Sequence, residues 1–265
     1  MKDISFLKRK ANQFRVDVLR KTYETKKGHI GGTFSCIDIL VYLYYNLLHI
    51  PSPTDSNRDR VVIGKGHICY ALYCIFADLG WIDNELLDEW GKNGSFLGGQ
   101  LHIDTPGVEY SSGSLGHAVG VGAGMAWVAK HDGRKFKVYA LIGDGECAEG
   151  SIWEAISFAV AAKLDNLIVI VDSNKLSATD VSDDPLLPKK FESFGCTVYR
   201  VDGHDFQALD NCFSNISGLG PSVVIADTIK GKGISFAEHV ARWHNGIPSE
   251  QEYFSALTEL SALGV

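Results

Sequence analysis

The sequence predicts an α/β fold: a doubly wound, mainly parallel sheet with helices on both faces. Short β-branched runs alternate with longer helical stretches along much of the chain. Two of these runs, KVYALI (137–142) and NLIVIVD (166–172), are almost entirely apolar, which is typical of parallel strands covered on both faces. The 265 residues contain no internal repeat and no obvious linker. We therefore expect a single domain over residues 1–265.

The first 90 residues are predicted to be mainly helical. An amphipathic helix over 3–27 is stopped by Gly28, and Ser35 is expected to cap a second helix that runs to about Leu48. The run RVVIG (60–64) predicts a short strand. Two further helices are expected after it, one over 67–80 and a short one that is capped by Asp83 and carries Trp90.

Residues 91–116 contain seven glycines and no clear period. An irregular stretch of this length inside a compact chain usually has a function. A helix rich in small residues should follow over 115–130, and strands and helices should then alternate to the end of the chain. The expected strands cover 137–142, 166–172, 197–201 and 222–228.

Composition excludes several classes of function. A net charge of −7 without long basic runs argues against nucleic-acid binding. The longest apolar run, IDILVYLYYNLLHI, is too short and too polar to cross a membrane. The six cysteines form no Cys-x-x-Cys pair, and no signal peptide is recognised. These features predict a cytoplasmic protein whose cysteines are small core residues.

Polar residues follow two of the predicted strands. Gly143-Asp144-Gly145 ends one strand and Asp172-Ser173-Asn174 ends the next. Ligands bind beyond the carboxyl ends of parallel strands, and carboxylate and amide oxygens suit Mg²⁺ completed by phosphate oxygens. The pair favours a Mg²⁺–diphosphate site over two unrelated turns. The run GVGAGM (120–125) is no dinucleotide fingerprint, because it lies in a predicted helix with no strand before it.

The pattern GDG…N resembles the thiamine diphosphate motif, and the surrounding sequence is similar to the transketolase family. The matching segments follow the order of that family: KGHIGGTFSCIDIL (27–40), RDRVVIGKGHICYALY (58–73), TPGVEYSSGSLGHAVGVGAGMA (105–126), GDGECAEGSIWEA (143–155), KLDNLIVIVDSN (163–174), VDGHDF (201–206) and DTIKGKGISF…WHNG (227–246). The chain resembles the N-terminal, diphosphate-binding subunit of a split transketolase. The pyrimidine-binding and C-terminal domains are then expected on a partner chain.

The resemblance also implies roles for individual residues. The expected metal ligands are Asp144, Asn174 and the carbonyl oxygen of Leu176, for Mg²⁺ or another divalent cation such as Ca²⁺ or Mn²⁺. The expected contacts to thiamine diphosphate are His67, Gly113, Ser114, Leu115, Gly145, Glu149, Asn174 and His244. The expected catalytic histidines, placed at the sugar or the diphosphate, are His29, His67, His102 and His244. Glu149 would also connect paired active sites. His117 departs from the glutamine that is usual in the family.

The function that this resemblance implies is transfer of a two-carbon ketol unit from a ketose, or its phosphate, to an aldose. The partner chain would supply the glutamate that activates the aminopyrimidine, in an expected α2β2 assembly, so this chain alone should be inactive. Three alternatives remain open. They are a related enzyme specialised for a modified sugar in secondary metabolism or polysaccharide synthesis, another thiamine diphosphate enzyme such as a 2-oxoacid dehydrogenase α chain, and a non-catalytic scaffolding subunit.

Overall fold

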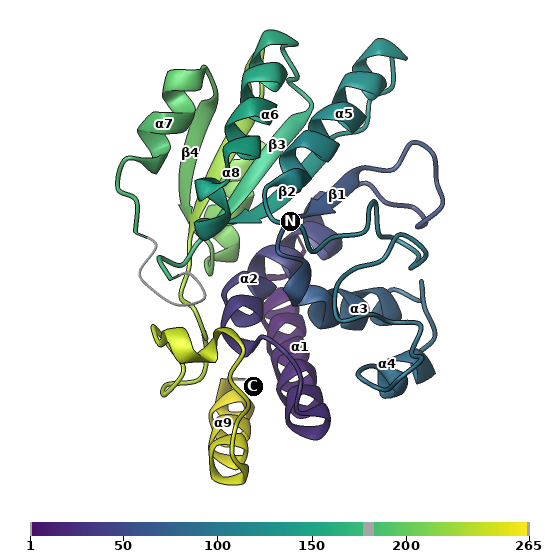
Figure 1. Ribbon diagram of the computed structural model, residues 1–265, viewed down its shortest axis with the longest axis vertical. Helices are drawn as coiled ribbons and strands as arrows, with labels where there is room; N and C mark the ends of the chain where they lie inside the picture. Colours follow the sequence, from purple (N-terminus) through teal and green to yellow (C-terminus); the bar gives the residue numbers. More distant parts are fainter. Residues whose placement is uncertain (1, 177–182, 264–265) are drawn as a thin grey trace.

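The protein is built around a five-stranded parallel sheet (Figure 1). The computed structural model describes residues 2–176 and 183–263. The strands lie in the order β1-β2-β3-β5-β4, and their bounds are β1 (Arg60–Ile63), β2 (Val138–Gly143), β3 (Leu167–Ser173), β4 (Thr197–Asp202) and β5 (Ser222–Asp227). All neighbouring pairs are parallel. The predicted fold class is confirmed, and each strand end lies within one residue of its expected position.

Helices cover both faces of the sheet (Figure 1). One face packs against α5 (His117–His131), α6 (Gly150–Ala161) and α7 (Leu187–Phe194). The other face packs against α1 (Ile4–Thr25), α2 (Ile30–Tyr42), α3 (Cys69–Asp78) and α8 (Phe206–Ser214). Successive β3 residues point into opposite cores: Val169 belongs to the first and Ile170 to the second. This alternation, with both faces covered, is why the strand sequences are apolar throughout.

The second helix begins earlier than predicted. Helix α2 starts at Ile30 and is followed by a π-helical turn, Leu43–Leu47. Ser35 is therefore not a cap but a buried residue inside the helix. The helix includes Gly31 and Gly32, and both glycines are needed for close packing. A Cβ would lie 2.7 Å from the Trp243 carbonyl oxygen at Gly31, and 2.9 Å from His67 Nε2 at Gly32.

The remaining helices and turns agree with the sequence prediction in order and approximate position. A 3₁₀ turn, Gly66–Ile68, precedes α3, and α4 (Glu85–Glu89) is the short helix before Trp90. Asp83 does not cap α4: the residue before the helix is Asn84, and no side chain forms a cap hydrogen bond there. Residues 91–116, all of them described, contain no helix or strand. The chain ends with a 3₁₀ turn, Ala241–His244, and α9 (Glu250–Leu263).

The six cysteines are free thiols, and all except Cys212 are buried. No helix in the described part of the chain has the length and apolar character needed to cross a membrane. The carboxyl ends of β1, β2, β3 and β5 lie at one edge of the sheet, where Gly143 pairs with Asp172. The residues that follow these four strands are therefore brought together there.

Candidate functional site

A pocket of about 340 Å³ lies at this edge of the sheet. It is lined by Asp144, Asn174 and Leu176, the three residues whose oxygen atoms are expected to bind a metal. Asp144 Oδ1 accepts a hydrogen bond from the Gly145 amide at 2.7 Å, and Oδ2 accepts one from the Lys175 amide at 2.5 Å. The fold thus assembles a carboxylate, an amide and a backbone carbonyl, which are the oxygen types that hard divalent cations bind.

The Asn174 amide is held in one orientation by its neighbours. Its Nδ2 donates to Asp172 Oδ2 at 3.3 Å and to Ser35 Oγ at 3.4 Å. Its Oδ1 accepts a hydrogen bond from the Leu176 amide at 3.1 Å. Because Nδ2 faces two acceptors, the oxygen faces the Leu176 backbone, where the predicted metal ligands gather.

An ion pair is buried directly beneath these donors. Lys65 follows β1 and Asp172 lies in β3; their side chains are in contact and are 5% and 0% exposed. Asp172 also accepts hydrogen bonds from Ser35 at 2.6 Å and from Thr228. Burial opposes the charged forms of both groups, but their mutual attraction holds the pKa of Asp172 below and that of Lys65 above the usual value. Both groups are therefore charged at neutral pH.

A second lysine reaches the same pocket. Lys230 Nζ donates to the Leu176 carbonyl at 3.0 Å and lies 3.3 Å from His244 Nδ1. Burial, and then repulsion from Lys65, lower the pKa of Lys230 to about 8. The pocket therefore combines oxygen ligands for a cation with the Lys230 ammonium, which favours an anion. A metal-bound diphosphate carries both kinds of charge.

Three histidines gather beside this pocket. The ring of His67 lies 5.1 Å from those of His29 and His244, and the last two are 5.4 Å apart. Burial, and then nearby cations, lower the pKa of His29, bring that of His244 to about 4, and place that of His67 well below its usual value. His67 Nε2 is buried and has no hydrogen-bond partner among the described residues. Three neutral imidazoles thus form one cluster.

We expect these three histidines to titrate below pH 6.5, with His244 near pH 4. Because the folded state takes up protons at lower pH than the unfolded chain, the free energy of unfolding should fall as the pH drops from 6.5 toward 4. Imidazole Cε1–H resonances recorded by NMR across this range test the prediction. A midpoint above 6.5 for any of the three would contradict it, and His244→Asn should remove part of the acid destabilisation.

Of the other residues predicted to contact the cofactor or the sugar, some lie at this pocket and some do not. Leu115 lines the pocket and is 45% exposed; Gly113 and Ser114 precede it in the chain and are also exposed. His102 is not brought into the histidine cluster: its side chain is 56% exposed and its Nδ1 lies 3.3 Å from Asp104 Oδ2. Glu149 is an exposed residue at the start of α6.

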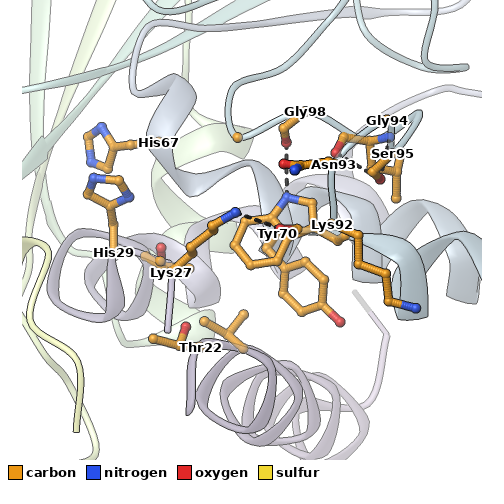
Figure 2. Close-up of a pocket in the computed structure, with 17 residues that line it drawn as sticks. Thr22, Lys27, His29, His67, Tyr70, Lys92, Asn93, Gly94, Ser95 and Gly98 are labelled. Carbon is orange, nitrogen blue, oxygen red and sulfur yellow. Dashed lines mark hydrogen bonds between the residues drawn. The ribbon is translucent and has the colours of Figure 1, made fainter. Parts of the chain in front are cut away.

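A second pocket, of about 350 Å³, adjoins the first, and His67 lines both (Figure 2). His29 and His67 lie side by side at one end of it. The rest of its wall comes from α1, from residues 27–28, from Thr33 and Tyr70, and from the glycine-rich stretch 90–99. The histidines therefore stand between a cavity suited to a metal-bound anion and a separate cavity with room for a small molecule.

The family described as "Transketolase, thiamine diphosphate binding domain" matches residues 7–258. The chain belongs to the transketolase family. It is 36% identical to a subunit of the apulose-4-phosphate transketolase of Phocaeicola vulgatus, over 97% of this chain and 95% of that protein. It is 35% identical to 6-deoxy-6-sulfo-D-fructose transketolase subunit SqwG of a Clostridium species, over 97% of each. It therefore matches subunits of split transketolases over almost their whole length.

Transketolases made as one polypeptide are much longer. The solved transketolase from Campylobacter jejuni superimposes with a TM-score of 0.90 and 30% identity, and the match covers 98% of this chain but 43% of that one. Human transketolase is 34% identical over 90% of this chain, which spans 39% of the human protein. The fold and the histidine cluster thus belong to the thiamine diphosphate binding domain of a transketolase.

The residues present fit the thiamine diphosphate and divalent cation that are typical of this family. The observations are the three oxygen donors of Asp144, Asn174 and Leu176 on one pocket, together with the nearby ammonium of Lys230. Glu146, which the sequence reasoning missed, adds a structural link. Its carboxylate is buried and accepts hydrogen bonds from the amides of Gly116, at 2.9 Å, and Gly143, at 3.2 Å. It joins the 113–116 loop to the Gly-Asp-Gly turn.

Lys65, Glu146 and Lys230 were all missed for a similar reason. They stand inside the matching motifs GKGH, GDGE and IKGKG, respectively, but carry no signal of their own in sequence. Asp172 was named only as part of a polar strand end, without a partner. Their shared signal could have been burial of charge, because acids and lysines at the ends of apolar strands need partners. Which acid meets which lysine depends on the strand order, which places β1 and β3 on either side of β2.

Proposed function

We propose that this chain is the N-terminal subunit of a two-chain transketolase that transfers a two-carbon ketol unit from a ketose to an aldose. The observation that carries the proposal is the position of His67. It lines both pockets and lies within 5.1 Å, ring to ring, of His29 and of His244. This position favours proton transfer at a sugar that enters one pocket while a cofactor occupies the other.

Asp144, Asn174 and the Leu176 carbonyl would hold Mg²⁺ or a similar divalent cation, and Gly145 and Lys230 would contact the diphosphate. Gly113, Ser114 and Leu115 would contact the rings of thiamine diphosphate, with Glu146 fixing their loop. When bound, the cofactor supplies the carbanion and the electron sink that cleavage beside a carbonyl requires. The protein's own contribution is to orient this cofactor and to exclude water.

The histidines would manage protons. Neutral imidazoles can accept a proton from one sugar hydroxyl and donate one to another oxygen, and the lowered pKa of His244, to about 4, keeps that ring neutral at pH 7. We keep His102 as a further candidate at the sugar; it stands outside the cluster, and its exposed ring leaves it open to contact with a partner chain.

The identity of the sugar is a separate question. Relatives that cover the whole chain are named for apulose 4-phosphate and for 6-deoxy-6-sulfo-D-fructose. Both sugars carry an anionic group, so we propose a sugar phosphate or a sugar with a similar anionic tail as the substrate. A role in secondary metabolism or polysaccharide synthesis is compatible with this. The histidine cluster argues against a 2-oxoacid dehydrogenase α chain, whose chemistry handles no sugar hydroxyls.

We propose a partner chain that carries the pyrimidine-binding domain and the activating glutamate, since relatives of similar length are named as subunits. Two copies of each chain would form an α2β2 complex. The exposed apolar side chains of Trp127, Val128 and Phe158, on α5 and α6, support self-association, and Glu149 lies at the start of α6. The cytoplasmic location stays a prediction.

Replacing His67 with alanine tests a catalytic role against a scaffolding role. In a complex reconstituted with the partner chain, we expect kcat/KM for ketol transfer to fall at least about 100-fold, as is typical when a positioned acid–base group is lost. His49→Ala, which changes an exposed histidine outside both pockets, is the matched control. Unchanged activity of His67→Ala would favour a scaffolding subunit.

A further inference from the structure

The second pocket has an unusual balance of charge for a protein with a net charge of −7. Among the described residues that line it, the charged groups are Lys27 and Lys92, and none is a carboxylate. His29 and His67 stand at one end, and beyond them lie Lys65 and Lys230, whose positive charges, after burial, lower the pKa of one or both histidines. The surroundings of this pocket are therefore locally positive and favour an anion.

Lys27 is directed into the pocket by the backbone. Gly28 has φ +140, and a Cβ there would lie 2.4 Å from Thr22 Oγ1, so this position requires glycine. The turn places Lys27 and His29 on the same pocket (Figure 2). Lys27 Nζ donates to the Gly91 carbonyl at 2.6 Å, which holds the ammonium over the pocket.

The other lysine behaves differently. Lys92 pairs with Glu89 at 2.8 Å, and Figure 2 shows its side chain extending away from the histidines. Lys27 forms no ion pair with any carboxylate of residues 2–176 or 183–263. An ammonium has three donor hydrogens, and the Gly91 carbonyl uses one of them. Lys27 is therefore equipped to bind an anion that enters the pocket.

We propose that Lys27 binds the anionic tail, a phosphate or a sulfonate, of the sugar whose carbonyl end meets His29 and His67. This inference rests on the proposed function and adds to it a residue that determines substrate specificity. The carbonyl end must lie near the histidines for proton transfer, so the far end of the sugar extends along the pocket toward Lys27. The shared chemistry is a tetrahedral oxyanion that accepts hydrogen bonds from an ammonium.

A purely structural role for Lys27 makes a different prediction. If Lys27 only ties the 27–29 turn to Gly91, its loss should disturb the pocket for every sugar. If it binds the anionic tail, its loss should affect charged sugars alone. Lys27→Gln separates the two cases, because the glutamine amide can still donate to a carbonyl but carries no charge.

The kinetic test uses the complex reconstituted with the partner chain and three matched donors: a ketose phosphate, the corresponding ketose sulfonate and the uncharged ketose. We expect Lys27→Gln to raise KM about 10-fold for the anionic donors, as for a lost hydrogen bond between charged groups, with kcat and the uncharged donor unchanged. Lys27→Arg should stay within about 3-fold of wild type because it keeps the charge. A response to only one of the two anions would identify the tail and support the inference.

Lys26→Gln is the matched control. It removes the same charge one residue away, from an ammonium that lies 3.6 Å over the Tyr23 ring. The inference is overturned if Lys27→Gln raises KM equally for the uncharged ketose, or if it changes KM for neither anion. Absence of ketol transfer with every donor would instead overturn the proposed function.

A second measurement does not depend on turnover. Reductive methylation of the complex, read by mass spectrometry, reports the accessibility of each lysine. We expect a ketose phosphate or inorganic phosphate to slow the modification of Lys27, but not that of Lys26, relative to chloride at equal ionic strength. Equal rates at Lys27 with and without phosphate would count against the anion site, whether or not the complex is active.

Discussion

Asp144→Asn should weaken binding of Mg²⁺ and thiamine diphosphate at least about 100-fold and reduce ketol transfer to background. Losing a group that merely supports a metal ligand already costs 10- to 100-fold in affinity, and here a ligand itself is changed. Calorimetric titration with Mg²⁺ and thiamine diphosphate measures the affinity apart from activity. Asp165→Asn is the matched control, since Asp165 is an exposed residue just before β3, at the opposite edge of the sheet.

The same variant should remain folded. Burial, and then the nearby Asp172 carboxylate, raise the pKa of Asp144 to about 6, so ionised Asp144 destabilises the metal-free protein at pH 7. Asparagine removes this charge but also loses one acceptor for the amides of Gly145 and Lys175. The two effects oppose each other, and we expect the free energy of unfolding to change by less than about 1.5 kcal/mol. A variant that is unfolded, or that binds the cofactor normally, would contradict the assignment of Asp144.

Lys65→Met should lower the free energy of unfolding by about 3–5 kcal/mol, the cost of leaving one charge of a buried pair without its partner. Asp172 is fully buried, and the hydroxyls of Ser35 and Thr228 cannot replace an ammonium. Urea unfolding monitored by circular dichroism measures the change. The loss should be greatest at neutral pH and smaller in acid, where protonation removes the stranded Asp172 charge.

The double variant Lys65→Met/Asp172→Asn provides the internal check. Neutralising both partners should recover part of the lost stability, because no uncompensated charge remains buried. Lys130→Met is the matched control: it breaks the ion pair with Asp165, whose side chains are 44% and 49% exposed, and should cost less than about 1 kcal/mol. A loss below about 1 kcal/mol for Lys65→Met would mean that the pair contributes little to the fold.

The strands could be predicted from the sequence because a parallel strand that is buried on both faces is encoded by a short run without polar residues. Polar residues directly after such runs, at Asp144 and Asn174, also predicted the edge of the sheet that carries the site. The start of α2 could not be predicted from local pattern. Gly31 and Gly32 look like helix breakers, and only the close approach of Trp243 and His67 explains why glycine is needed there.

The supporting residues of the site depend on contacts between distant segments. Ser35 looked like a cap, but it donates to Asp172 from the middle of a buried helix. Lys27 is the last residue of the helix predicted over 3–27, and only the fold brings the 91–99 stretch to its side chain. Of the four histidines that the family motifs singled out, the structure brings His29, His67 and His244 together, whereas His102 lies apart from them. Motifs thus selected the candidate residues, while contacts between distant segments fix their geometry.

The most direct test is ketol transfer measured with this chain alone, with the partner chain alone and with the two together, each with Mg²⁺ and thiamine diphosphate. We predict transfer from a ketose phosphate to an aldose only in the mixture, and none when the Asp144→Asn variant replaces the wild-type chain. Transfer by this chain on its own would contradict a cofactor site that needs a second polypeptide. Undiminished transfer with Asp144→Asn would contradict the site described here.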